Sequence, residues 1–243
     1  MLLYLRNVDP SQWGTLIAFL VTYLFPVMLI SLSVHEASHA WTALKLGDDT
    51  PQKMGRISLN PLHHFDLFGA MMIVFVGMGW GKPVQLDATK LKPTPQLGMA
   101  LVAVAGPISN LILATLGALV LRTHFLTFTP QKAFTIGGLN YYFSPGQFVE
   151  MFVLLNLGLM FFNLIPLAPL DGSRLWQIFL PQKVYWQYAR FELFAAMFVI
   201  GLVLIDLFLN NGNVLSGILT RPICNTWRIL VGFGTPDMCL QLS

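Results

Sequence analysis

The stretch that decides the fold of this chain is Val34-His35-Glu36-Ala37-Ser38-His39-Ala40, which has the pattern H-E-x-x-H. Side chains four residues apart share one face of a helix, so His35 and His39 can present two imidazole nitrogens to one metal ion. This spacing suits tetrahedral zinc. Glu36 cannot reach the same point as a ligand, but it can act as general base on a water molecule held by the metal. Two structural histidines and a solvated glutamate are the alternative interpretation.

The surroundings of this motif favour the metal site. No charged residue occurs between Pro10 and Val34, so unpartnered polar side chains at the end of this apolar run would be costly. Over its 243 residues the chain is 55% hydrophobic and only 10% charged, against about 25% charged in a soluble domain. We therefore expect an all-α membrane protein embedded in a lipid bilayer, a polytopic helical bundle with no nucleic-acid partner.

The apolar runs predict the membrane helices of a single intramembrane domain over residues 1–243, with its core at about 13–175 and C-terminal helices within 190–233. A first helix is expected from Trp13 to Leu46, kinked by Pro26. Further spans are expected at 97–121, 145–165 and 191–209. No cleavable signal peptide and no appended soluble domain are expected.

The remaining segments are shorter or more polar. Residues 67–81 are too few to span and predict a re-entrant or tilted segment, and the alternation at 56–60 allows a short strand before it. Residues 122–144 are expected to form a loop, and 173–190 an amphipathic interfacial loop. Residues 214–233 are interpreted as an interfacial or re-entrant piece, or as a last span. A disulfide between Cys224 and Cys239 is possible but not favoured, because their spacing fits neither a zinc site nor a disulfide framework.

Catalytic zinc usually has three protein ligands, so one is missing from the histidine motif. The candidates are eight of the other acidic and histidine side chains: His63, His64, Asp66, Asp87, Glu150, Asp171, Glu192 and Asp206. Asp171 stands out because it follows a span in Pro-Leu-Ala-Pro-Leu-Asp-Gly, where two prolines break the helix. Unwound chain at membrane depth is tolerated where it lines a cavity or is buried in protein. An ordinary surface loop is the alternative.

Topology supports the choice of Asp171. His39 and Asp171 can share a metal only if an odd number of full crossings separates them, so 97–121 must cross and 67–81 must not. The positive-inside rule then places the N-terminus outside. The basic residues of the inside loops under this assignment are Lys45, Lys53, Arg56, Lys82, Lys90, Lys92, Arg174, Lys183 and Arg190.

With these residues assembled, the chain resembles the site-2 protease family of intramembrane zinc metalloproteases, in its compact prokaryotic branch without a PDZ or CBS domain. That family carries H-E-x-x-H on one helix and N-x-x-P-x-P-x-L-D-G on another. The second motif here is Asn163-Leu164-Ile165-Pro166-Leu167-Ala168-Pro169-Leu170-Asp171-Gly172, with Ala168 at the second family proline. Gly106-Pro107-x-x-Asn110 is similar to the central G-x-x-x-N pattern. The resemblance covers about residues 31–175.

The resemblance implies three core helices around one Zn²⁺ per chain and cleavage of transmembrane protein substrates in or near the bilayer. It assigns His35, His39 and Asp171 as zinc ligands and Glu36 as the base. Asn110 and Asn163 are candidates for holding an unwound substrate strand or the developing oxyanion, with helix-to-helix hydrogen bonds as the alternative. Residues 52–81 are a candidate strand edge for the substrate.

Some assignments stay open. His64 and Asp66 are interpreted either as orienting a metal ligand or as a buried structural pair. Two other functions are weighed: a non-catalytic membrane chaperone or binding protein, and a zinc transporter. An intact Glu36 argues against the first, and the absence of an internal repeat argues against the second. The expected location is a prokaryotic cell membrane, multi-pass, with the active site nearer the cytoplasmic face. The oligomeric state is left open.

Overall fold

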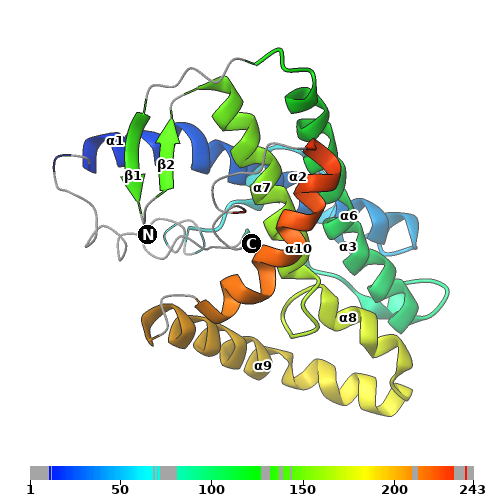
Figure 1. The fold of residues 1–243 in the computed structure, drawn as a ribbon. Helices are drawn as coiled ribbons and strands as arrows, with labels where there is room; N and C mark the ends of the chain where they lie inside the picture. Colours follow the sequence, from blue (N-terminus) through cyan, green and yellow to red (C-terminus); the bar gives the residue numbers. More distant parts are fainter. Residues whose placement is uncertain are drawn as a thin grey trace.

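The computed structural model describes residues 11, 13–67, 69, 71, 81–126, 132–136, 139–142, 144–209, 213–232 and 239. Figure 1 shows a largely helical protein, which agrees with the predicted all-α membrane class. The helices are α1 (Trp13–Phe19), α2 (Phe25–Lys45), α3 (Thr50–Lys53), α4 (Pro61–His64), α6 (Pro95–Arg122), α7 (Pro145–Asn163), α8 (Gly172–Trp176), α9 (Gln182–Leu209) and α10 (Asn213–Val231). Short helical turns are η3 (Leu20–Leu24), η4 (Ala88–Lys90) and η5 (Gln177–Phe179).

Three helical stretches among the described residues are long and apolar enough to cross a membrane: Trp13–Lys45, Pro95–Arg122 and Pro145–Asn163. They confirm helices over the first predicted stretch and over 97–121 and 145–165, each with the length and composition of a membrane span. The predicted span at 191–209 lies within α9. There the described apolar stretch is shorter, Met197–Asp206, so that span stays a prediction.

The first helix accommodates Pro26 by a change of helix type. Proline has no N–H to donate to the carbonyl four residues earlier, and its ring crowds that carbonyl. The preceding turn, Leu20–Leu24, is a π-helix, and the Phe25 N–H donates to the Leu20 carbonyl, five residues back. The irregularity expected at Pro26 therefore takes the form of a π turn directly before it.

Small residues allow α6 to pack closely between its neighbours. A Cβ atom at Gly117 of α6 would lie 2.7 Å from Val153 Cγ2 of α7. Ala114 and Ala118 of α6 are also buried against α7, and Trp227 of α10 completes this core. In Figure 1, α7 and α10 lie beside α6, whereas α9 extends below them. Close contact through small residues is a common way for membrane helices to associate.

Two segments predicted as loops contain regular structure. Residues 122–144 include an antiparallel hairpin of β1 (Lys132–Ile136) and β2 (Leu139–Tyr142), with Ile136 opposite Leu139. Strands this short show too few alternations to be recognised in a sequence. Residues 173–190 form most of α8, η5 and the start of α9, which begins directly after Pro181. Residues 56–60 form irregular chain, so the strand that their alternation allowed is not formed.

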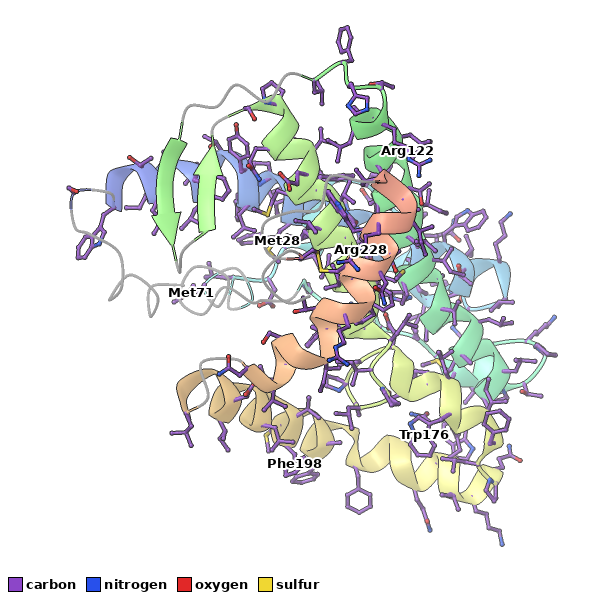
Figure 2. The ribbon with its side chains drawn as sticks, viewed as in Figure 1. Met28, Met71, Arg122, Trp176, Phe198 and Arg228 are labelled. Carbon is purple, nitrogen blue, oxygen red and sulfur yellow. A yellow bond between two sulfur atoms is a disulfide. The ribbon has the colours of Figure 1, made fainter. Side chains whose placement is uncertain are left out.

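Cys224 and Cys239 form a disulfide, which the sequence left possible but did not favour. Fifteen positions separate them, and no local pattern signals that residue 239 lies beside α10. Cys224 is buried, as is Trp227 one turn further along α10. The disulfide, drawn as a yellow bond in Figure 2, thus ties residue 239 to the part of α10 that packs against the core.

The predicted re-entrant segment, 67–81, lies largely outside the described residues, and so does part of the proposed strand edge at 52–81. The flanks of that segment meet. The Lys82 N–H donates to the His64 carbonyl at 2.8 Å, and the buried Arg56 guanidinium donates to the carbonyls of His63 and Lys82. The chain therefore returns to the place from which it departs before α6 begins.

Candidate metal centre

Three ligand atoms converge at the centre of the fold. His35 and His39 lie one turn apart on α2, and Asp171 lies between α7 and α8. The two Nε2 atoms are 3.0 Å apart, and Asp171 Oδ2 lies 3.2 Å from His35 Nε2 and 3.4 Å from His39 Nε2. Tetrahedral zinc with ordinary bond lengths separates adjacent ligand atoms by about 3.3 Å. The three side chains therefore match the spacing of a zinc site.

Hydrogen bonds behind the two rings direct their lone pairs toward this point. His39 Nδ1 donates to the Val102 carbonyl at 2.7 Å, and His35 Nδ1 donates to Asn110 Oδ1 at 2.5 Å. With hydrogen on both Nδ1 atoms, both Nε2 atoms present lone pairs. Asp171 Oδ2 is buried without a hydrogen-bond partner. Three electron-pair donors that face one another in a buried place favour a bound cation, and two imidazoles with a carboxylate suit zinc.

Gly106 of α6 provides the space for this cluster. A Cβ atom at this position would lie 2.5 Å from both His35 Cε1 and His39 Nε2, which is closer than real side-chain atoms approach. The backbone of α6 can therefore lie directly against the two imidazoles. Asn110, one turn further along α6, is then within reach of His35.

Asp171 reaches the centre because the chain unwinds after α7, as the two prolines predicted. Pro166 and Pro169 cannot donate backbone hydrogen bonds, and residues 164–171 form turns and bends. Gly172 follows the ligand, and a Cβ atom there would overlap the Leu164 carbonyl. Glycine at this position therefore lets the chain fold back against the end of α7.

A cavity of about 360 Å³ opens beside the three ligand atoms. Glu36 lines it, and its carboxylate accepts the Val84 N–H at 3.3 Å. Asn163 and Arg174 line it as well, and Asn163 Nδ2 donates to the Leu159 carbonyl of its own helix. The Glu36 carboxylate, the side-chain donors of Asn163 and Arg174, and the three candidate ligands thus line one cavity that is large enough to admit water.

The predicted site residues separate into two groups. His35, Glu36, His39, Asn163 and Asp171 all line this cavity. Asn110 does not line it: the side chain is fully buried and bonds to His35 of α2 and Asn156 of α7. The structure therefore gives Asn110 the helix-to-helix bonds that the sequence left as the alternative to a substrate contact.

The other candidates for the third ligand lie elsewhere. His64 Nε2 bonds to the Ser58 carbonyl at 2.7 Å, and Asp66 accepts the Gly69 N–H. Asp87 accepts from Thr89, and Asp206 accepts the Val214 and Leu215 N–H groups at the start of α10. None of the bonds described for His64 joins it to a candidate metal ligand or to Asp66, so its orienting role and its pairing with Asp66 both stay predictions.

Two further residues of the site have a recognisable signal in the sequence. Asn156 is an amide in the middle of an apolar span, where a polar side chain is costly unless bonded. It contacts Asn110 and Ser31. Arg174 follows Asp171 by three positions, and the positive-inside rule treats it only as a loop charge, although it lines the cavity.

Two histidines, an aspartate and a nearby glutamate within a bundle of apolar helices define a membrane protein with a metallopeptidase-type zinc site. Comparison with known proteins agrees. The family model described as Peptidase family M50 matches residues 23–205, and the chain belongs to this family. It is a zinc metalloprotease.

Individual relatives carry corresponding names. The chain is 39% identical over 186 residues to "Putative zinc metalloprotease YwhC" of Bacillus subtilis (strain 168), covering 76% of this chain and 80% of that protein. It is 29% identical over 179 residues to "Putative zinc metalloprotease Rip2" of Mycobacterium tuberculosis (strain ATCC 25618 / H37Rv), covering 72% and 64%. No solved structure matches the chain.

Proposed function

We propose that this metalloprotease is an intramembrane endopeptidase that hydrolyses peptide bonds in membrane-spanning segments of other proteins. The observation that carries the proposal is the position of Glu36 and the three ligand atoms around one cavity, between helices that are long and apolar enough to span a membrane. The family and the names of its relatives support the zinc-dependent chemistry. The membrane location of the site supports transmembrane proteins as substrates.

The chemistry assigns one role to each side chain. His35, His39 and Asp171 would hold the zinc ion, which when bound would supply a Lewis acid for the carbonyl and for a water molecule. Glu36 takes the proton from the attacking water and passes it to the leaving nitrogen as the C–N bond breaks. The Val84 N–H holds the Glu36 carboxylate in place. Asn163 is proposed to bind the backbone of an unwound substrate, because its amide lies in the same cavity.

The proposed location is a prokaryotic cell membrane that the chain crosses several times, with its N-terminus outside. In this orientation the ends of α2 and α7 that carry the ligands lie toward the cytoplasm. The basic residues Lys45, Lys53, Lys90 and Lys92 support it, because they lie at the same end of the bundle. Water is proposed to reach the cavity from that face.

The test replaces Glu36 by glutamine, which keeps the shape of the side chain and removes the base. In liposomes containing candidate membrane segments, Glu36→Gln should lower cleavage by about 10²-fold or more and leave the zinc content unchanged. Glu150→Gln is the matched control, because Glu150 lies on α7 and bonds to Gln147 rather than lining the cavity. Cleavage by Glu36→Gln at the rate of the natural enzyme would reject the assigned base.

The same assay separates the two alternative functions. A membrane chaperone would bind the segments but release no fragments in either form. A zinc transporter would move zinc into the liposomes, and that flux would not depend on a peptide substrate. Fragment analysis of membrane proteins from cells with natural or Glu36→Gln enzyme would then identify the substrates.

A further inference from the structure

A chain of buried amides connects the metal centre to α7. Asn110 of α6 and Asn156 of α7 have no exposed surface, and Ser31 of α2 is equally buried. Asn110 Nδ2 donates to Asn156 Oδ1 at 2.8 Å, and Asn156 Nδ2 donates to Ser31 Oγ at 2.9 Å. Buried amides are costly unless they are bonded, so each of these side chains depends on the next.

The orientation of these two amides is fixed by a bond on α7. Asn156 Nδ2 also donates to the Phe152 carbonyl of its own helix at 2.8 Å. A backbone carbonyl can only accept, so Asn156 must turn its nitrogen toward Phe152 and its oxygen toward Asn110. Asn110 must then turn its own nitrogen toward Asn156. Its oxygen is left to face His35.

The orientation of the Asn110 amide determines the tautomer of His35, a candidate metal ligand. An amide oxygen can only accept, so His35 carries its hydrogen on Nδ1 and keeps the Nε2 lone pair for a metal. For His39 the same tautomer is imposed directly by a backbone carbonyl, that of Val102. For His35 the partner is a side-chain amide, which could present either end if nothing held it. Asn156 is what holds it.

We propose that Asn156 is a positioning residue, which fixes the direction of the Asn110 amide and thereby keeps His35 in the tautomer that binds zinc. This goes beyond the proposed function, because it concerns metal binding and requires no substrate. Asn156 also lies on the helix that precedes Asp171. α7 therefore affects His35 through its hydrogen bonds, and the chain that follows α7 carries Asp171.

The decisive variant is Asn156→Leu, which keeps the branching at Cγ and removes both polar ends. Asn110 can then turn over and present its nitrogen to His35. Zinc affinity of the metal-free, full-length protein in detergent is measured by competition with a chromophoric chelator. The expected dissociation constant is about 10- to 100-fold higher than that of the natural chain. An unchanged constant would overturn the proposal.

A double variant distinguishes an effect of the orientation of the Asn110 amide from an effect of packing. In Asn156→Leu/Asn110→Asp, the carboxylate accepts from His35 Nδ1 whichever way it turns, so zinc affinity should recover by about tenfold. Asn110→Asp alone should bind zinc more weakly than the double variant, because its second oxygen then faces the oxygen of Asn156. Absence of both effects would show that Asn156 acts only through packing, which contradicts the proposal.

Two further measurements keep the test independent of folding and of proteolysis. Ser33→Ala is the control, because Ser33 is a buried serine of α2 that bonds only to the Leu29 carbonyl among the bonds described for it. It should leave zinc affinity unchanged within about twofold. In the natural chain without metal, ¹⁵N NMR of neutral His35 should show hydrogen on Nδ1. Hydrogen on Nε2 would overturn the proposal without any variant.

Discussion

At Gly106 the two imidazoles of the metal centre occupy the space in which any other residue would place a side chain. This contact explains a glycine that helix propensity disfavours by about 1 kcal/mol relative to alanine. Glycine is needed here despite its lower helix propensity, because α6 must approach α2 closely enough to bring Asn110 to His35. One missing Cβ atom therefore determines both the room for a metal ion and the support of a ligand.

Replacing Gly106 by alanine tests this role. The added Cβ atom would lie 2.5 Å from His35 Cε1 and His39 Nε2, and both rings belong to buried, bonded side chains that cannot move freely. We expect the bound zinc per chain, measured by elemental analysis, to fall about tenfold or more, and peptidase activity to fall with it.

Gly158→Ala is the matched control for this substitution. Gly158 lies within α7, and a Cβ atom there would meet nothing within 4 Å. This variant should retain the zinc content of the natural chain, because alanine in a helix without a steric conflict is neutral or stabilising. A full complement of zinc in Gly106→Ala would show that α6 can move away from the rings.

At the scale of elements, a buried carboxylate helps to hold the segment between α4 and α6 against the end of α2, together with the Lys92 N–H, which donates to the Leu46 carbonyl. Asp48 has no exposed surface. It accepts the Thr50 N–H at 2.9 Å and the Asp87 N–H at 2.7 Å. The chain just before Asp87 supplies Val84, whose N–H faces Glu36. Asp48 therefore fixes the part of the cavity wall that contains Val84, through backbone N–H groups and not through the candidate metal ligands.

Asp48→Asn is expected to loosen this wall. One of the two N–H groups would then face an amide nitrogen instead of an oxygen, which leaves a buried donor unsatisfied at a cost of about 1–3 kcal/mol. Chemical unfolding should report this loss of stability. The KM for a cleaved membrane segment should rise, and kcat should fall as well, because the loosened wall carries the Val84 N–H that holds Glu36.

Asp49→Asn is the control at the next position. Asp49 is an exposed side chain, and hydrogen bonds from Lys53 and Lys90 hold its pKa at about 2. Exposed ion pairs contribute little, so unfolding and KM should stay close to those of the natural chain. Equal effects of the two substitutions would assign them to charge alone and would contradict the role given to the buried carboxylate.

At the scale of the whole molecule, the direction of the helices decides which ends meet. α2 and α7 run in the same direction, because α6 returns between them, and this is why His39 and Asp171 meet. The hydrogen bond between His64 and Lys82 supports this arrangement, since the chain between them departs and returns at one place. In the proposed orientation, with the N-terminus outside, residues near α3 would lie in the cytoplasm and the end of α6 would lie outside.

Reporter cysteines test this orientation. Thr123→Cys at the end of α6 should react with a membrane-impermeant maleimide in intact cells, whereas Gln52→Cys in α3 should react only after permeabilisation. Both positions are exposed, and no free cysteine occurs among the described residues to compete for the reagent. The reverse labelling would invert the orientation, and labelling of both in intact cells would contradict the crossing of α6.

Much of this protein followed from local patterns in the sequence. Long uncharged runs predicted the spans around α2, α6 and α7, because a helix that crosses the bilayer needs about 20 predominantly apolar residues. Helical periodicity alone was enough to pair His35 with His39 on one face. Asp171 followed from two less direct signals, a proline-broken stretch at membrane depth and the number of crossings. Each of these is a property of neighbouring residues or of chain direction.

What the tertiary structure decided is the set of contacts between distant parts of the chain. The disulfide between Cys224 and Cys239, the hairpin of β1 and β2 and the helical course of residues 173–190 were not predicted from local patterns. The hydrogen-bond partners of Asn110 also depend on the packing of α2, α6 and α7. An amide in an apolar helix needs a partner, but the neighbouring residues in the sequence do not determine which group that partner is. Periodicity indicates which face of a helix is turned inward, but only the packed structure shows what that face contacts.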